Sequence, residues 1–317
     1  MSRVGVVILT HNRADEVTAT LAHMVALPDR PRLVVVDNGS TDDTAACLSQ
    51  RFPDVAVVRL AENAGAAGRN AGVAHLDTPY VAFCDDDTWW ASGSLDRAAD
   101  LLDAHPSVGL VCGRVLVGTT NAPDPACAAM ASSPLPRQRD VPGRPVLGFM
   151  CAASMVRRHA FVDAGGFEPR FFIGGEEELL AVDLAAAGWV LTYVPEVVVH
   201  HHPSRQRDST RRRRLVARNA LWCAWLRRPW PSAARRSVAV LRARARGRVA
   251  PTLIEALCGL RWVLRHRRVV PPGVEAALRI LENGSYAVRR RMMRRPDAGG
   301  AGGAWDDAPG SSSRFAR

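Results

Sequence analysis

Three consecutive aspartates, Asp85, Asp86 and Asp87, follow an apolar run at residues 80–84. The run predicts a short buried strand, so the three carboxylates should emerge together at its C-terminal end. In open α/β sheets that edge is where ligands bind. Three like charges repel one another unless a cation neutralises them, and hard oxygen ligands suit Mg²⁺ or Mn²⁺. The cluster therefore predicts a divalent metal site, with a solvated acidic turn as the alternative.

Three other polar clusters end or follow predicted strands. They are Thr-His-Asn-Arg at 10–13, Asp-Asn-Gly-Ser-Thr-Asp at 37–42, and the glycine-rich segment 63–72 that leads into a helix. Glycines let a backbone approach phosphate closely, and a helix N-terminus favours anions. We expect all four clusters to converge on one ligand. Taken singly, Asp37 also fits a turn, Gly65 a crowded loop and Arg69 a solvated helix face.

The elements that must position these clusters alternate along the first 200 residues. Apolar patterns predict strands at 4–9, 33–36, 55–58, 80–84 and 108–117, and helices at 16–27, 68–76 and 95–105. Ser40 or Thr41 is expected to cap a further helix that runs to about Arg51. Residues 118–145 read as a long loop, followed by a helix at about 177–187 and strands at 190–194 and 197–201. The alternation predicts an α/β fold with a mostly parallel, doubly wound sheet flanked by helices.

The charge of the chain changes along its length. Residues 1–200 hold 15 arginines and 24 acidic residues, whereas residues 201–317 hold 27 arginines and 7 acidic residues. The second part shows arginine-rich helical patterns at about 209–228, 232–246, 252–267 and 274–294. We expect a catalytic domain at 1–204, a basic helical extension at 205–295, and a disordered tail at 296–317.

The cysteines and the N-terminus bear on localisation. Seven cysteines occur without a CxxC pair, which favours a reducing cytosol. The N-terminus enters a predicted strand at once, and no stretch reaches the roughly 18 apolar residues of a membrane span. We expect a cytoplasmic protein. Peripheral attachment to the inner face of the plasma membrane stays open.

Taken together, the four clusters resemble the motifs of family-2 glycosyltransferases of GT-A fold, which is Rossmann-like. The resemblance also includes Gly165-Gly-Phe167 through Gly188-Trp189 and spans about residues 3–204. It implies an inverting enzyme that moves a sugar from a UDP-, GDP- or dTDP-sugar to an acceptor hydroxyl. The expected acceptor is a glycan or lipid-linked glycan of the cell envelope. The expected transferred group is a hexosyl or deoxyhexosyl residue.

The resemblance also implies roles for single residues. Asp37 would contact the base or ribose, and Asp85 and Asp87 match the DxD pair that holds Mn²⁺ or Mg²⁺. Asp86 would orient the donor sugar or the other two aspartates. The full set of implied nucleotide-sugar contacts is Thr10, Arg13, Asp37, Asn63, Gly65, Arg69, Asp85 and Asp86.

Two further roles follow from position relative to family landmarks. Counting back from Gly188-Trp189 puts Glu177 where the family has its catalytic aspartate, with Glu176 and Glu178 as rivals. A histidine after the last strand often completes the metal site in the family, and the offset from Pro195 favours His201 over His200.

The basic extension admits three interpretations. Aromatic residues beside arginines, as at Trp222, Trp225 and Trp230, suit an anionic membrane surface. A packed helical cap with a solvated arginine face is the second. Nucleic-acid binding is the third, and we do not expect it. For the whole chain, a non-catalytic nucleotide-sugar-binding homologue is the alternative to an enzyme.

Overall fold

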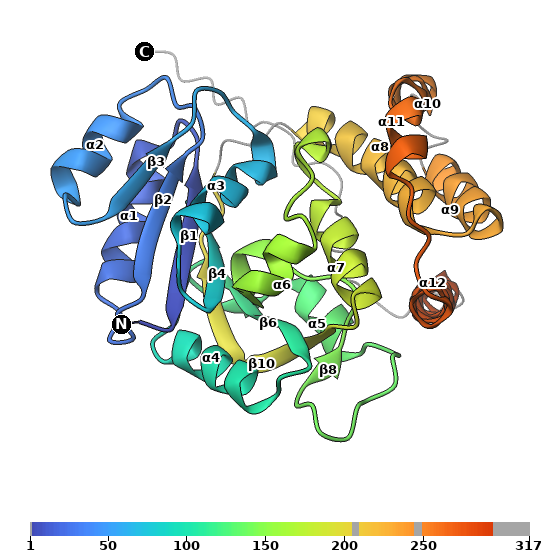
Figure 1. Cartoon of the computed structure of the whole chain (residues 1–317), viewed down its shortest axis with the longest axis horizontal. Helices are drawn as coiled ribbons and strands as arrows, with labels where there is room; N and C mark the ends of the chain where they lie inside the picture. Colours follow the sequence, from blue (N-terminus) through green and yellow to red (C-terminus); the bar gives the residue numbers. More distant parts are fainter. Residues whose placement is uncertain (1, 205–208, 244–248, 294–317) are drawn as a thin grey trace, which may run out of the picture. The chain divides into compact units, whose positions relative to one another are not determined.

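The computed structural model describes residues 2–204, 209–243 and 249–293, and Met1–Leu281 form one compact unit (Figure 1). The strands are β1 (Val4–Thr10), β2 (Arg32–Asp37), β3 (Ala56–Arg59), β4 (Tyr80–Asp85), β5 (Thr88–Trp90), β6 (Val108–Val117), β7 (Ala122–Pro123), β8 (Arg144–Pro145), β9 (Ser154–Arg157) and β10 (Val190–His201). The α-helices are α1 (Ala14–Val25), α2 (Thr44–Arg51), α3 (Gly68–His75), α4 (Ser94–Ala104), α5 (Pro125–Ala131), α6 (Arg158–Asp163), α7 (Glu176–Ala186), α8 (Ser209–Arg227), α9 (Trp230–Ala243), α10 (Val249–Cys258), α11 (Leu260–His266) and α12 (Pro272–Met293). Short 3₁₀ turns lie at η1 (Gly65–Ala67), η2 (Cys151–Ala153) and η3 (Pro169–Phe171).

The strands form one mixed sheet in the order β3-β2-β1-β4-β9-β6-β10-β5. The four strands β3, β2, β1 and β4 run parallel, as do β6 and β10, while β9 lies antiparallel between β4 and β6. In the parallel register Thr10 lies opposite Asp37, and Leu9 lies opposite Asp85. The predicted α/β fold with a mostly parallel sheet is confirmed, and the ends of three strands meet at one edge.

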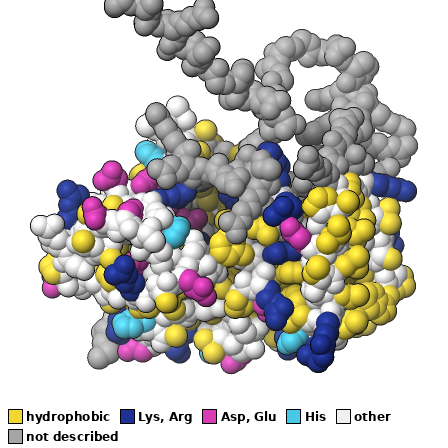
Figure 2. Space-filling model, turned by 90° about the horizontal axis from the view of Figure 1, so that it is seen from above, with side chains coloured by type: hydrophobic (Ala, Val, Ile, Leu, Met, Phe, Trp, Pro, Cys, Tyr) yellow, Lys and Arg dark blue, Asp and Glu magenta, His cyan; other side chains and the backbone are white. Residues whose placement is uncertain are grey.

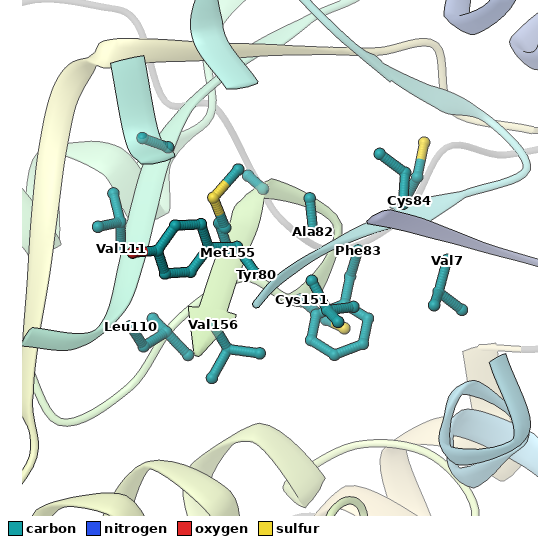
Figure 3. Packing of buried hydrophobic residues seen from close by; sticks show 14 of the residues in the cluster. Val7, Tyr80, Ala82, Phe83, Cys84, Leu110, Val111, Cys151, Met155 and Val156 are labelled. Atoms are coloured by element: carbon teal, nitrogen blue, oxygen red, sulfur yellow. The ribbon is translucent and has the colours of Figure 1, made fainter. Parts of the chain in front are cut away.

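The core lies between the sheet and its flanking helices. Figure 3 shows side chains from β4, β6 and β9, among them Phe83, Leu110 and Met155, packed together without exposure to solvent. Phe83 also contacts the rings of Phe161 and Phe167, at centroid distances of 5.4 and 5.5 Å. Burial of one such side chain stabilises the fold by about 1.5–3 kcal/mol. This packing fixes the strand whose end carries the three aspartates.

Helix α3 lies close against β1 and β2 because Gly72 has no side chain. A Cβ atom at Gly72 would come within 2.5 Å of Val7 Cγ1 and 2.9 Å of Val36 Cγ2. The absence of that atom lets the helix approach the sheet at van der Waals distance. The approach places Arg69, one turn earlier, at the C-terminal edge of the sheet.

The C-terminal helices pack through α8 onto the rest of the compact unit. A second apolar cluster joins Phe171 and Leu179 to Leu221, Trp222 and Trp262. Arg227 of α8 forms an ion pair with Asp183 of α7. Trp222 and Arg227 are thus buried within the packed helices. No helix in the described part of the chain is both long and apolar enough to span a membrane.

Several expected element boundaries were wrong. Helix α2 begins at Thr44, because Ser40 Oγ accepts a hydrogen bond from the Asn12 N–H and the Thr41 N–H donates to Asn12 Oδ1. Ser40 and Thr41 therefore join the loops after β1 and β2 and do not cap the helix. Strand β5 was missed because it has only three residues.

The expected loop at 118–145 contains α5, with Asp124 as N-cap and Pro125 as first residue, and the short strands β7 and β8. The two strands expected at 190–194 and 197–201 are one strand with an irregular register between them. The helix expected at 252–267 is two helices that meet at Gly259, where a Cβ would lie 2.4 Å from the Trp222 ring. The boundaries of the three expected domains stay a prediction, and the expected disordered tail at 296–317 lies outside the described residues.

Candidate active site

A pocket of about 690 Å³ opens at the C-terminal edge of the sheet. It is lined by the ends of β1, β4 and β10, the loops that carry η1 and η2, and the N-terminal turns of α3, α7 and α8. The structure brings to it most of the residues that the sequence singled out: Thr10, Arg13, Asn63, Gly65, Arg69, Asp85, Asp86, Asp87, Glu177 and His201.

The turn between β4 and β5 sends the three aspartates to three different partners. Thr88 Oγ1 accepts a hydrogen bond of 2.8 Å from the Asp85 N–H and so holds the turn closed. The Asp85 carboxylate forms an ion pair with Arg69 and is 39% exposed. Its two neighbours are buried, and each has a basic partner from a different element.

Asp86 points back beneath β1. Its carboxylate accepts hydrogen bonds from Thr10 Oγ1 at 3.1 Å and from Arg13 Nη1 at 2.7 Å. Burial raises the pKa of Asp86 to about 6, although the Arg13 charge and hydrogen bond act in the opposite direction. Asp86 thereby fixes Thr10 and Arg13 at the wall of the pocket.

Asp87 faces the last strand of the sheet. Its Oδ1 lies 3.5 Å from His201 Nε2, and its Oδ2 accepts a hydrogen bond of 3.0 Å from the Ser204 N–H. The Asp87 carbonyl also accepts from the His202 N–H at 2.8 Å. These contacts tie the end of β10 to the β4–β5 turn, so an imidazole and a carboxylate share one side of the pocket.

Gly65 brings the glycine-rich loop against the segment that precedes α7. Its φ is +61°, and a Cβ there would lie 2.1 Å from the Phe172 carbonyl oxygen. The next residue, Ala66, donates its N–H to that same oxygen at 2.6 Å. A side chain at Gly65 would separate the two loops, and with them Arg69 from Glu176 and Glu177.

The first three residues of α7 are glutamates, and their side chains lie in different surroundings. The helix follows Gly174 and Gly175, which both have positive φ. Glu176 is 6% exposed, and within the described residues its Oε2 has no hydrogen-bond partner. Glu177 is half-buried and lines the pocket beside Glu176. Glu178 does not line it, and its Oε1 lies 3.9 Å from Arg236 Nη2.

Burial changes the acidity of the two pocket glutamates. Burial and, to a lesser extent, the nearby Glu177 charge raise the pKa of Glu176 to about 8. The pKa of Glu177 is also raised, mainly by burial, while Arg69 and Arg212 act against this. A carboxyl with a raised pKa accepts a proton more readily than an exposed one does.

Helix α8 of the C-terminal extension holds the loop at residues 171–174, which precedes the glutamates of α7. Asn219 of α8 donates hydrogen bonds from its amide to the carbonyls of Phe171 at 2.8 Å and Ile173 at 3.2 Å, and also to that of Gly174. Arg218 donates to the Phe171 carbonyl at 3.1 Å. Because Asn219 is fully buried, these bonds fix the start of α7.

Asp37 does not line the pocket. Its carboxylate is completely buried, accepts a hydrogen bond from the Ser40 N–H at 2.9 Å, and lies 3.4 Å from Arg59 Nε. Its neighbour Asn38 lines the pocket in its place and bonds Asn63 Oδ1 at 3.1 Å and the Gly65 carbonyl at 3.0 Å. A direct contact between Asp37 and a nucleotide stays a prediction.

The tryptophans after the aspartates do not face the pocket. Trp90 is buried in the core, where its indole N–H donates to the Phe83 carbonyl at 3.0 Å. Trp89 lies between the rings of His23 and His200, with centroids 4.2 and 5.5 Å away. His200 therefore stacks on Trp89, and His201 alone of the two lines the pocket.

Sequence reasoning missed several lining residues. They are Leu9, His11, Asn38, Ala66, Thr88, Val115, Asp124, Phe149, Met150, Cys151, Ala152, Phe172, Ile173, Arg212 and Leu215. Asn38 and His11 sit inside motifs that had been singled out. Arg212 and Leu215 belong to α8 and gave no local signal, because only tertiary packing brings them to the sheet edge.

The residues present fit a divalent cation in part. No group of three or more His, Cys, Asp or Glu side chains in the described ranges is arranged to hold one. Asp87 and His201 nevertheless line the pocket 3.5 Å apart, and carboxylate and imidazole both bind Mn²⁺-type ions. A cation held by one or two protein groups takes its other ligands from water and substrate phosphates.

A family model described as "Glycosyl transferase family 2" matches residues 5–164, which is 160 of the 317 residues. The N-acetylglucosaminyl-diphospho-decaprenol L-rhamnosyltransferase of Mycobacterium tuberculosis (strain ATCC 25618 / H37Rv) is 27% identical over 232 residues, or 62% of this chain and 75% of the relative.

Two solved structures share the fold. The mannosyltransferase PcManGT from Pyrobaculum calidifontis, in complex with GDP-Man and Mn²⁺, superposes with a TM-score of 0.52 at 20% identity, over 92% of this chain and 88% of that chain. Residues 1–349 of S. aureus TarS, in complex with UDP-GlcNAc, give a TM-score of 0.55 at 17% identity, over 86% and 83%. With the family model and the sheet topology, these findings establish that the chain belongs to glycosyl transferase family 2 and has the GT-A fold.

Proposed function

We propose that the protein transfers a hexosyl or deoxyhexosyl group from a nucleoside-diphosphate sugar to an acceptor hydroxyl, with inversion at the anomeric carbon and with help from Mn²⁺ or Mg²⁺. The observation that carries the proposal is the pocket itself. It gathers basic side chains, an Asp–His pair and a half-buried glutamate from separate elements around one cavity of about 690 Å³.

The diphosphate side of the pocket would be the sheet edge. Arg69 is buried at the N-terminus of α3, and Arg13 is held by Asp86. Asn63 and Gly65 supply backbone close to the same edge. Asp87 and His201 would hold the cation, with Asp85 within the same turn. A bound divalent cation supplies charge neutralisation for a diphosphate leaving group.

Glu177 would be the general base. Its carboxylate takes the proton of the acceptor hydroxyl while that oxygen bonds to the anomeric carbon. The bond from that carbon to the diphosphate oxygen breaks, and the nucleoside diphosphate leaves with both electrons. Attack from the face opposite the leaving group inverts the configuration. Arg69 and Arg13 stabilise the charge that develops on the leaving group.

The acceptor class is supported by similarity and not by geometry. The M. tuberculosis relative carries the name of an enzyme that adds L-rhamnose to a decaprenol-linked sugar diphosphate. We propose a glycan of the cell envelope, built on a lipid carrier, as the acceptor of this chain too. The apolar residues Phe149 and Met150 also line the pocket and offer surface for a sugar face.

The test is a screen of UDP-, GDP- and dTDP-sugars for hydrolysis and for thermal stabilisation in the presence of Mn²⁺, with wild type and Glu177→Gln side by side. We expect one donor to stabilise both proteins and only the wild type to turn it over. Stabilisation without turnover by the wild type and any acceptor would favour a non-catalytic binding protein. No stabilisation by any donor would contradict the proposal.

A further inference from the structure

The helices α10 and α11 expose a row of large apolar side chains. Ile254 is 60% exposed, Leu257 is 50% exposed and Leu264 is 53% exposed. Ile254 and Leu257 lie three residues apart on one face of α10, and Leu264 follows on α11 after the break at Gly259. The opposite face is buried through Thr252, Ala256, Trp262 and Val263. The exposed side chains therefore form the outer face of helices whose inner face is packed against the rest of the protein.

Arginines share this outer face. Arg261 and Arg265 are exposed and follow Leu257 at helical spacings of four and eight residues. Between residues 249 and 271 the sequence has four arginines and one acidic residue, Glu255, which is bound to Arg214 of α8 at 3.0 Å. We call Ile254, Leu257, Arg261, Leu264 and Arg265 the α10–α11 stripe. It carries positive charge with no exposed acidic residue among its members.

An exposed aromatic side chain adjoins the end of the stripe. Trp230 at the start of α9 is 51% exposed, and the Arg267 guanidinium lies 3.9 Å from its ring centroid. Figure 2 shows hydrophobic side chains gathered over the C-terminal helices, with arginines along the margins. Tryptophan and arginine together, beside an apolar face, are typical of segments that lie in the head-group region of a bilayer.

The composition of the stripe distinguishes among possible partners. A second copy of the chain in a two-fold contact would bring the arginines of both stripes together, and like charges repel. A nucleic acid would engage the arginines but leave Ile254, Leu257 and Leu264 without a partner. An anionic bilayer suits both kinds of side chain in the stripe. The aliphatic side chains can insert at the boundary of its acyl chains, and the arginines can bind its anionic head groups.

We propose that the α10–α11 stripe docks the protein on an anionic lipid surface. The stripe lies in the compact unit that also contains the pocket, so docking would bring the enzyme to the leaflet where a lipid-linked acceptor resides. The inference adds a partner to the proposed function. It stands on its own observations, and its test requires neither donor nor turnover.

The test is flotation of the full chain with vesicles of phosphatidylglycerol and phosphatidylcholine in equal parts, compared with phosphatidylcholine alone. We expect the wild type to float with the anionic vesicles. The variant Ile254→Glu/Leu257→Glu should lose affinity by about tenfold or more, because it removes the inserted apolar groups. The matched control is Val25→Glu/Val162→Glu, which adds the same charge at sites 54% and 51% exposed on α1 and α6. The control should float like the wild type.

A second pair separates charge from apolar insertion. Arg261→Gln/Arg265→Gln should weaken binding to the anionic vesicles about tenfold, while Arg51→Gln/Arg97→Gln, also exposed, should change it little. Ile254→Ser/Leu257→Ser serves if the glutamate variant melts early. Equal flotation of stripe and control variants would overturn the inference. So would a wild type that stays with the soluble fraction, or one that binds RNA with the same dependence on Ile254 and Leu257.

Discussion

Each of the two acidic triplets contributes residues to the pocket, but the triplets differ in how their carboxylates pair with basic side chains. In the aspartate triplet each carboxylate has a basic partner from another element: Arg69 for Asp85, Arg13 for Asp86 and His201 for Asp87. Within the part of the chain that the structure describes, the one ion pair found for the glutamate triplet joins Glu178 to Arg236, and Glu178 does not line the pocket. Among the described residues, Glu176 has a buried oxygen with no hydrogen bond.

The difference shows how identical neighbours acquire different chemistry. A tight turn between two strands places successive aspartates against three different basic side chains, so their carboxylates are held in separate, ordered positions. A helix N-terminus after two glycines keeps Glu176 and Glu177 together in a buried place, where a raised pKa favours proton transfer. We interpret the first triplet as the cation and diphosphate side and the second as the proton-transfer side.

The largest expected effect is at the proton-transfer side. Glu177→Gln removes the general base but keeps the size and polarity of the side chain, so kcat should fall by roughly 10²–10⁴-fold. Donor affinity, measured by calorimetry, should stay within about threefold, since the residue contacts the acceptor side. Glu178→Gln is the matched control and should keep its activity, because Glu178 does not line the pocket. A Glu177→Gln enzyme with wild-type kcat would assign the base elsewhere.

The next effect is at the cation side. Asp87→Asn keeps the shape but removes the charge, and transfer should fall by about 10²–10³-fold. The stabilisation of the protein by Mn²⁺ together with a nucleoside diphosphate should be lost as well, as seen in thermal melts. Asp163→Asn, an exposed aspartate on α6, is the control. Equal stabilisation of Asp87→Asn and wild type by Mn²⁺ would contradict the assignment of the aspartate triplet to the cation side of the pocket.

A smaller effect should arise from the helix that holds the glutamate triplet. Asn219→Ala removes the amide that donates to the carbonyls of Phe171, Ile173 and Gly174, and within the described ranges only the Phe171 carbonyl keeps Arg218 as a side-chain donor. We expect this to cost about 1–3 kcal/mol of unfolding free energy. We expect a lower Tm and a reduced kcat, with donor affinity largely kept. Ser237→Ala removes a hydrogen bond to Trp225 from the far side of α8 and should leave kcat unchanged. Unaltered kcat in Asn219→Ala would show that the loop needs no such support.

The smallest effect concerns pH and stability. The folded-state pKa of Glu176 is raised to about 8 from an ordinary 4.5, so the folded state binds the extra proton between these values. The contribution of Glu176 to stability is therefore largest below about pH 4.5 and falls as the pH rises towards 8. Glu176→Gln cannot ionise, so its Tm relative to wild type should be higher at pH 8 than at pH 5, by roughly 2 °C or more. An identical Tm difference at both pH values would contradict this.

Local sequence patterns predicted the sheet and most of the pocket for a physical reason. Parallel strands must place their C-terminal ends at one edge, so motifs that follow strands meet there whatever the loops do. Thr10, Arg69 and the aspartates follow this rule. Asp87 and His201 are 114 residues apart in the sequence, but Asp87 lies in the turn that follows β4 and His201 is the last residue of β10.

What the sequence did not predict depends on contacts between distant segments. The burial of Asp37 follows from Arg59 and Ser40, and no pattern around Asp37 reveals it. Likewise Arg212 and Asn219 reach the pocket or its support only through the packing of α8 on Phe171 and Leu179. In contrast, α5 carried a readable signal in Asp124-Pro125, an N-cap followed by proline at the first position.

The most direct measurement is a crystal structure of the protein with Mn²⁺ and the nucleoside diphosphate of its donor, with manganese located by anomalous scattering. The account predicts a manganese peak bound by Asp87 and His201, a diphosphate between it and Arg69, and Glu177 across the pocket from the leaving group. A nucleotide bound elsewhere, with both acidic triplets facing only solvent or their present partners, would contradict it.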